Sequence, residues 1–170
     1  MAHLKSLRKH LLYLLTKGGA HATFEDAVKN VPVAARGKVP EGAAHSLWEL
    51  LEHKRIGQWD ILKFSTDAKH VSPKWPKGYW PKTPAPPNAK AWDKCVKEFL
   101  ADRGALCKLV EKKSTDLFAE IPHGKGQTIL REALLVADHN AYTVGEIVLT
   151  RRLLGVWKAK KNPAEDEAES

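Results

Sequence analysis

Residues 128–157, TILREALLVADHNAYTVGEIVLTRRLLGVW, are the last long apolar stretch of the chain, and they decide its predicted fold. Apolar residues recur here at intervals of three and four, the period of an α-helix, at Leu130, Leu134, Ala137, Ala141, Val144 and Val148. Thr128 can cap the start of this helix by accepting a backbone N–H. At 1.5 Å per residue the helix would be roughly 45 Å long, a length that suits a helical bundle.

The middle of this predicted helix is polar where a bundle would hold apolar core. The polar residues are Asp138, His139, Asn140, Tyr142, Thr143 and Glu146. We therefore expect a site that requires polar side chains at this level of the bundle.

Four further helical segments precede this one. Long amphipathic helices are expected at residues 4–17, from 44 or 46 to 65, and at 89–113, and a short helix should follow the capping residue Thr23. The short helix should reach residue 28 or 30, ending before Pro32. With no internal repeat and no strand pattern, the sequence predicts an all-α, up-and-down-type bundle forming a single domain over residues 1–157. Residues 158–170 are predicted to be a disordered, charged tail.

The connection over residues 67–90 differs from the others in composition. It contains six prolines, which preclude a helix or a central strand, and three large aromatic residues, Trp75, Tyr79 and Trp80. The aromatic residues favour a packed cover over one end of the bundle. Whether this cover is a lid that gates a ligand or a static connection stays open.

The composition narrows the function classes. The chain has 170 residues and a formal net charge of +8, but its Lys and Arg residues are mixed with Asp and Glu and form no long block. This pattern favours solubility over an anionic partner. No apolar run reaches the roughly 18 residues of a membrane span, and the first helix carries too much charge for a signal peptide. We therefore expect a cytoplasmic protein without a membrane partner, in which Cys95 and Cys107 are reduced, partly buried thiols.

Two of the eight histidines, His53 and His139, are candidates for a site because each lies in mid-helix beside apolar neighbours. The other six lie near termini, in loops or at helix starts, where a solvated imidazole is expected. Two buried imidazoles on different helices can share a metal ion or hydrogen-bond to each other, and the spacing leaves both open. A catalytic zinc needs three protein ligands, so a metal centre requires a further ligand.

Few further ligands are available near this pair. Thr143 lies one helical turn from His139 on the same face. Glu146 lies about 10 Å along the helix axis from His139, so that direct ligation by both would need strained geometry. Glu49 and Asp60 are expected to be surface charges, with an orienting role toward an imidazole N–H as the alternative.

Two segments resemble the signature helices of the DinB-like superfamily. They are HSLWELLEHKRIGQWDIL at residues 45–62 and ADHNAYTVGEIVLTRRLLG at residues 137–155, and the resemblance extends over most of the chain. It implies a four-helix bundle, often dimeric, in which three histidines hold a divalent metal such as zinc or nickel. His53 and His139 match the first two ligand positions.

The remaining positions of the DinB-like pattern are substituted in this chain. The third ligand position is Thr143, and the usual Gln position is Glu146. Because a threonine hydroxyl is a poor ligand for zinc or nickel, the resemblance implies a degenerate site that binds metal weakly or not at all. Members with intact sites include metal-dependent transferases and isomerases that use low-molecular-weight thiols, and neither cysteine of this chain matches a catalytic position.

Three function classes follow from the sequence. An enzyme acting on a thiol or a small electrophile would hold metal despite Thr143. A binding or interaction module would instead hydrogen-bond His53 to His139, Thr143 or Glu146. Nucleic-acid binding is the least favoured class, because the chain has neither a recognition-helix signature nor a basic run.

Overall fold

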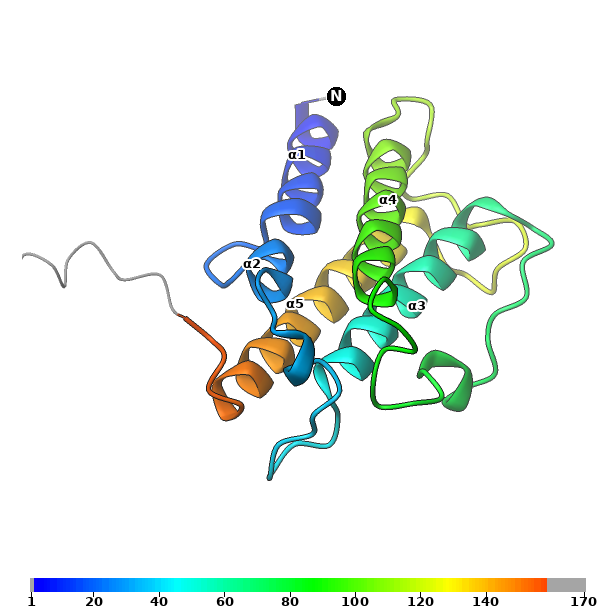
Figure 1. The fold of residues 1–170 in the computed structure, drawn as a ribbon. Coiled ribbons are helices and arrows are strands. Elements are labelled where there is room, and N and C mark those ends of the chain that lie inside the picture. Colours follow the sequence, from blue (N-terminus) through cyan, green and yellow to red (C-terminus); the bar gives the residue numbers. More distant parts are fainter. Residues whose placement is uncertain (1, 159–170) are drawn as a thin grey trace, which may run out of the picture.

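The computed structural model describes residues 2–158, and over that range the chain is helical (Figure 1). Its α-helices are α1 (Ala2–Lys17), α2 (Phe24–Val28), α3 (Leu47–Thr66), α4 (Ala91–Glu111) and α5 (Ile129–Leu153). The 3₁₀ helices η1 (Val33–Ala35) and η2 (Lys77–Tyr79) lie in connections. Within residues 2–158 the only β-type pairing is one isolated bridge between Glu120 and Thr128. The predicted all-α class is therefore confirmed, and the predicted tail lies, from residue 159 onward, outside the described residues.

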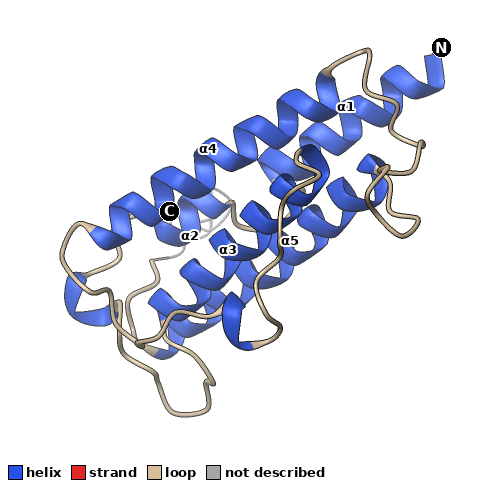
Figure 2. Ribbon diagram, turned by 90° about the vertical axis from the view of Figure 1, so that its right-hand side faces the viewer, coloured by secondary structure: helices blue, strands red, loops and turns tan. Residues whose placement is uncertain are grey.

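The four long helices form two layers, α1 beside α4 and α3 beside α5 (Figure 1). α3 packs against both α4 and α5, and α1 also contacts both of them. The short α2 packs against α5. Figure 2 shows the long helices running roughly along a common direction. This arrangement places the polar middle of α5 directly against α3.

Side-chain caps fix the starts of three helices. The hydroxyls of Thr23 and Thr128 accept the backbone N–H of the third residue of α2 and α5, as the sequence predicts. Ser46 and Glu49 form a complete capping box at the start of α3, in which each side chain accepts a backbone N–H of the other residue. Glu49 was expected to be a surface charge, and its role is instead to close this cap.

The predicted extent and buried face of α5 require correction. The helix ends at Leu153 rather than at residue 157, because Gly155 adopts a positive φ of 68°, a left-handed conformation that stops the helix. Leu134, assigned to the apolar stripe, is 47% exposed, whereas Ala133 and Val136 are buried. The physical reason is that α1 and α3 flank α5 on two sides. The buried face of α5 is therefore wider than the predicted apolar stripe, and its centre does not coincide with that stripe.

The core has two apolar clusters separated by a polar layer. One cluster surrounds Leu51, Phe99 and Ile147, and the other surrounds Leu106 and Val136. Between them, α3 and α5 contribute Lys54, Gln58 and Asn140, joined by hydrogen bonds that run from Lys54 Nζ to Asn140 Oδ1 and from Asn140 Nδ2 to Gln58 Oε1. The polar middle predicted for α5 thus continues across the bundle as a hydrogen-bonded layer.

None of the helices within residues 2–158 is both long enough and apolar enough to cross a membrane.

Candidate functional site

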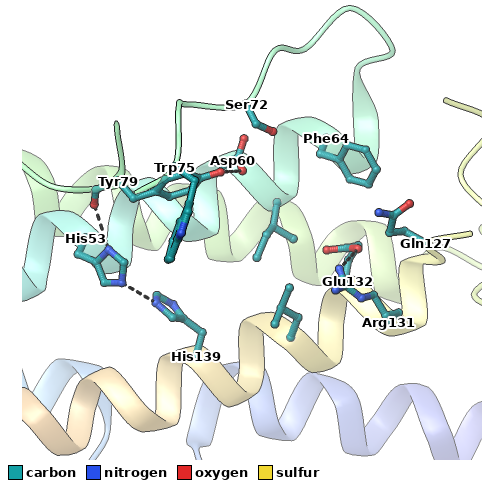
Figure 3. A pocket seen from close by; sticks show the side chains of 13 residues that line it. His53, Asp60, Phe64, Ser72, Trp75, Tyr79, Gln127, Arg131, Glu132 and His139 are labelled. Carbon is teal, nitrogen blue, oxygen red and sulfur yellow. Dashed lines mark hydrogen bonds and ion pairs between the residues drawn. The ribbon is translucent and has the colours of Figure 1, made fainter. Parts of the chain in front are cut away.

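His53 of α3 and His139 of α5 meet at the polar layer (Figure 3). Their Nε2 atoms lie 3.1 Å apart, and His53 Nδ1 lies 3.0 Å from the backbone carbonyl oxygen of Tyr79. The indole of Trp80 stacks on the His53 ring with centroids 4.1 Å apart and planes 5° from parallel. The His53 imidazole is therefore held on its edge by hydrogen bonds and on its face by an aromatic ring from segment 67–90.

These contacts assign a proton arrangement to the pair. Burial lowers the pKa of His53, and burial together with the neighbouring His53 and Lys54 lowers the pKa of His139 to about 4. Both rings are thus neutral near pH 7. Since a carbonyl oxygen only accepts, His53 Nδ1 carries the hydrogen and donates to Tyr79, which leaves its Nε2 as an acceptor for His139 Nε2–H. His139 Nδ1 then carries a free lone pair.

Gly57 makes room for the His139 ring. A Cβ atom at Gly57 would lie 3.3 Å from Cε1 of His139, closer than most such contacts. Gly57 is on α3, one helical turn after His53, so the two helices approach closely where the imidazoles meet. Glycine is costly in a helix interior, and the position of the His139 ring explains its presence here.

A cavity of about 380 Å³ opens beside the histidine pair. Its lining residues come from α3, α5 and the two connections that cover them: His53, Gly57, Asp60, Ile61, Phe64, Ser72, Trp75, Tyr79, Gln127, Arg131, Glu132, Leu135 and His139. Figure 3 shows the imidazoles at one end with Trp75 on their side of the cavity, and Glu132 and Arg131 toward the other end. Apolar walls with a few polar groups are typical of a small-molecule site.

Asp60 fastens segment 67–90 onto α3. Its carboxylate accepts hydrogen bonds from the Tyr79 hydroxyl at 2.6 Å and from His70 Nε2 at 2.7 Å. The predictions of a surface Asp60 and a solvated His70 were wrong: Asp60 is only 7% exposed, and the His70 side chain is also buried. Burial and the hydrogen bond to Asp60 raise the pKa of Tyr79 to about 12, so its hydroxyl remains a donor.

The predicted aromatic cover is present in part. Tyr79 and Trp80 pack against α3 through Asp60 and His53. Trp75, in contrast, is 71% exposed although it lines the cavity. Trp75 therefore forms the outer edge of the cavity rather than part of a sealed cover.

Glu132 is a site residue that the sequence reasoning missed. It lies in the first turn of α5, two helical turns before His139, and is only 2% exposed. Its Oε1 accepts from Arg131 Nη1 at 2.7 Å, and the Arg131 side chain is 57% exposed. The available signal was the seven-residue spacing from His139, which puts both residues on one helix face.

Thr143 and Glu146, expected at the pocket, do not line this cavity. Thr143 is buried, and its hydroxyl donates to the His139 backbone oxygen at 2.7 Å, within its own helix. Glu146 affects the pair only through its charge, which favours a raised pKa of His53. Burial lowers this pKa by more, so the pKa of His53 is lowered overall.

The residues present fit two positions of a metal centre but not a third. Two nitrogens bound to one zinc at about 2.0–2.1 Å in tetrahedral geometry lie about 3.3 Å apart, close to the 3.1 Å between the two Nε2 atoms. Within residues 2–158, however, no three His, Cys, Asp or Glu side chains form a group that could hold a metal ion. Thr143 would have to leave its helical hydrogen bond to ligate.

Lys54, also missed from the sequence, is fully buried beside the site. Its ammonium nitrogen donates to the backbone and side-chain oxygens of Asn140, each at 2.9 Å, and lies 5.0 Å from the Phe99 ring centroid. Burial holds the pKa of Lys54 well below its usual range.

The cysteines agree with expectation, since Cys95 is a buried free thiol and Cys107 a half-buried one. Burial raises the pKa of both thiols.

The chain matches no protein-family model, no curated protein and no solved structure.

Proposed function

We propose that the chain is a DinB-like four-helix-bundle protein that binds a small molecule in the cavity at His53 and His139. In this proposal the metal site of the superfamily is degenerate, with Thr143 at the third ligand position, and it binds a divalent metal weakly or not at all. The packing of α1, α3, α4 and α5 and the origin of the two histidines on α3 and α5 support the resemblance.

One observation carries the proposal. Two neutral imidazoles satisfy each other by a hydrogen bond at the end of a cavity of about 380 Å³ that is large enough for a small organic molecule. Three of the four ring nitrogens have partners without a metal, because the two Nε2 atoms bind each other and Tyr79 supplies the partner of His53 Nδ1. The cavity then offers apolar walls for binding and a few polar groups for orientation.

A second candidate is a divalent-metal-dependent thiol S-transferase or isomerase-like enzyme acting on a small electrophile. The separation of 3.1 Å between the two Nε2 atoms favours it, since two ligands of one zinc or nickel ion lie at a similar distance. A bound metal would supply activation of a low-molecular-weight thiol. The third position would need a ligand that Thr143 does not supply.

The family resemblance also extends to assembly and location. We propose a homodimer on that resemblance alone, with sedimentation equilibrium as its test. A cytoplasmic location is proposed from the two free thiols, which persist in reducing compartments. Nucleic-acid binding is not proposed, because the Lys and Arg residues form no basic run.

The test of the proposed function is a calorimetric titration with Zn²⁺ and with Ni²⁺. The natural protein is compared with Thr143→His and with the double variant His139→Ala/Thr143→His. Removing a residue that only hydrogen-bonds to a metal ligand weakens metal binding by roughly 10- to 100-fold. A residue that binds the metal directly contributes more, so Thr143→His should tighten metal binding by at least about 100-fold. The double variant should lose that gain. Tight stoichiometric binding by the natural protein would reject the proposal and favour the enzyme.

A further inference from the structure

Glu132 is a buried carboxylate with only one of its two oxygens engaged by the protein. Oε1 accepts from Arg131, whereas Oε2 has no hydrogen-bond partner among residues 2–158 and is not shut off from the cavity. Glu132 as a whole is only 2% exposed, and Arg131 compensates part of the cost of burying its charge. Oε2 is open to the cavity and can accept a hydrogen bond from a ligand placed there.

The charged groups in the cavity lining point to the same chemistry. The lining contains two carboxylates, Asp60 and Glu132, and one guanidinium, Arg131. Arg131 is already paired with Glu132, and because its side chain is largely exposed, water and salt screen its charge. Among residues 2–158, no lysine lines this cavity. By formal count the lining thus has one more carboxylate than guanidinium, and Asp60 is already bound by Tyr79 and His70, so Glu132 is the carboxylate that can take a further donor.

The walls between the polar ends are apolar and aromatic. The apolar part of the lining consists of Ile61, Leu135, Phe64 and the exposed ring of Trp75. Aromatic faces attract organic cations as well as apolar groups. The lining therefore suits a molecule that combines an apolar body with one positive group.

We infer that the ligand of this cavity is a small organic cation, a primary amine with an apolar body, whose ammonium group binds the Glu132 carboxylate. This inference rests on the proposed small-molecule role of the cavity and names its ligand class. The ammonium donates to Oε2, and the body of the ligand packs along Ile61 and Leu135 toward the histidine pair. Arg131 keeps its bond to Oε1 and holds the carboxylate in place.

The test uses three probes of similar shape and different charge. They are 2-phenylethylamine, 2-phenylethanol and 3-phenylpropionate, each titrated calorimetrically into the full-length protein near pH 7.5. A hydrogen bond to a buried charge should make the amine bind roughly 10- to 100-fold more tightly than the alcohol. The carboxylate should bind more weakly than the alcohol, because it meets Glu132 and Asp60.

Two variants connect the preference to Glu132. Glu132→Gln keeps the shape and an oxygen for Arg131 but removes the charge, so affinity for the amine should fall toward that for the alcohol, by a larger factor than any fall in affinity for the alcohol. Asp138→Asn removes the same charge from an exposed position on the same helix and should change neither affinity. Thermal unfolding of both variants, followed by circular dichroism, verifies that they are folded.

Several outcomes would overturn this ligand class: tighter binding of 3-phenylpropionate, an unchanged amine affinity in Glu132→Gln, or an equal loss in Asp138→Asn. Equal binding of all three probes would also overturn it but would leave the small-molecule cavity standing. If none of the three probes binds, the inferred ligand class is also overturned. The proposed function is then tested separately by the Zn²⁺ and Ni²⁺ titrations.

Discussion

Gly57 is the residue on which the geometry of the histidine pair depends most directly. Its missing side chain lets the His139 ring lie against α3, where an added Cβ would be only 3.3 Å from Cε1. The ring must therefore shift if any side chain is introduced. The same contact keeps His139 in reach of His53 and sets one end of the cavity.

Gly57→Ala separates this packing role from helix propensity. Replacing glycine in a helix interior should stabilise by roughly 0.5–1 kcal/mol, and Gly104→Ala in α4, where a new Cβ meets nothing within 4 Å, should show that gain. Gly57→Ala should gain less than Gly104→Ala or lose stability, because it displaces His139. Urea unfolding of both variants measures the difference, and equal gains would show that Gly57 does not position the ring.

His139 makes folding sensitive to acid. Its pKa is about 4 in the folded protein and 6.5 for an unperturbed histidine, so between these values the unfolded chain binds the proton and the folded chain does not. Stability should be fully present above pH 6.5 and should fall by up to about 3 kcal/mol as the pH drops toward 4. His139→Gln should lose this part of the slope in denaturant unfolding from pH 7 to 4. His10→Gln, at an exposed position of α1, should keep it, and the same slope in both variants would contradict the assignment.

At the scale of elements, segment 67–90 is fastened by a few polar bonds rather than by a continuous apolar face. The carboxylate of Asp60 binds both Tyr79 and His70, and Tyr79 in turn positions the carbonyl that accepts from His53. The connection and the histidine pair are thus linked through one residue of η2. Loosening this attachment should therefore affect the site as well as the loop.

Tyr79→Phe tests this attachment. It removes one hydrogen bond to a buried carboxylate, worth about 1.5–3 kcal/mol for a bond to a charged group, and should raise amide hydrogen exchange over residues 70–80. Tyr13→Phe, at a largely exposed tyrosine of α1, serves as the control and should change neither stability nor exchange. If exchange in the segment is unchanged in Tyr79→Phe, other contacts hold the connection.

The elements were predictable from local signals, whereas their contacts were not. Helix period and the caps at Thr23 and Thr128 placed the starts of two helices closely, and helix period alone placed the start of α3 near residue 44 or 46, because these signals lie within a few residues of one another. The end of α5 was placed too late, since the left-handed Gly155 was read as part of the helix. The contacts of Asp60 and Glu132 in the site depend on how separate elements pack. The sequence around a single acidic residue in a helix does not indicate whether its side chain will be buried.

At the scale of the whole molecule, the site lies where the polar layer of the core reaches the outside. Lys54, Gln58 and Asn140 cross the bundle between two apolar clusters, and the histidine pair and its cavity lie at the edge of that layer. The sequence singled out His53 and His139, because both are polar residues in mid-helix on apolar helices, and left open whether they share a metal ion or a hydrogen bond. In the structure these two imidazoles are a hydrogen-bonded, neutral pair beside a cavity.

The most direct test is ¹⁵N NMR of the histidine rings in the untagged natural protein at pH 7, before and after treatment with a metal chelator. We expect His53 to be protonated at Nδ1 and His139 at Nε2, with both spectra unchanged by the chelator. Histidine signals that shift when the chelator is added, with both Nε2 atoms lacking hydrogen beforehand, would mean that the pair ligates a metal and would contradict the account.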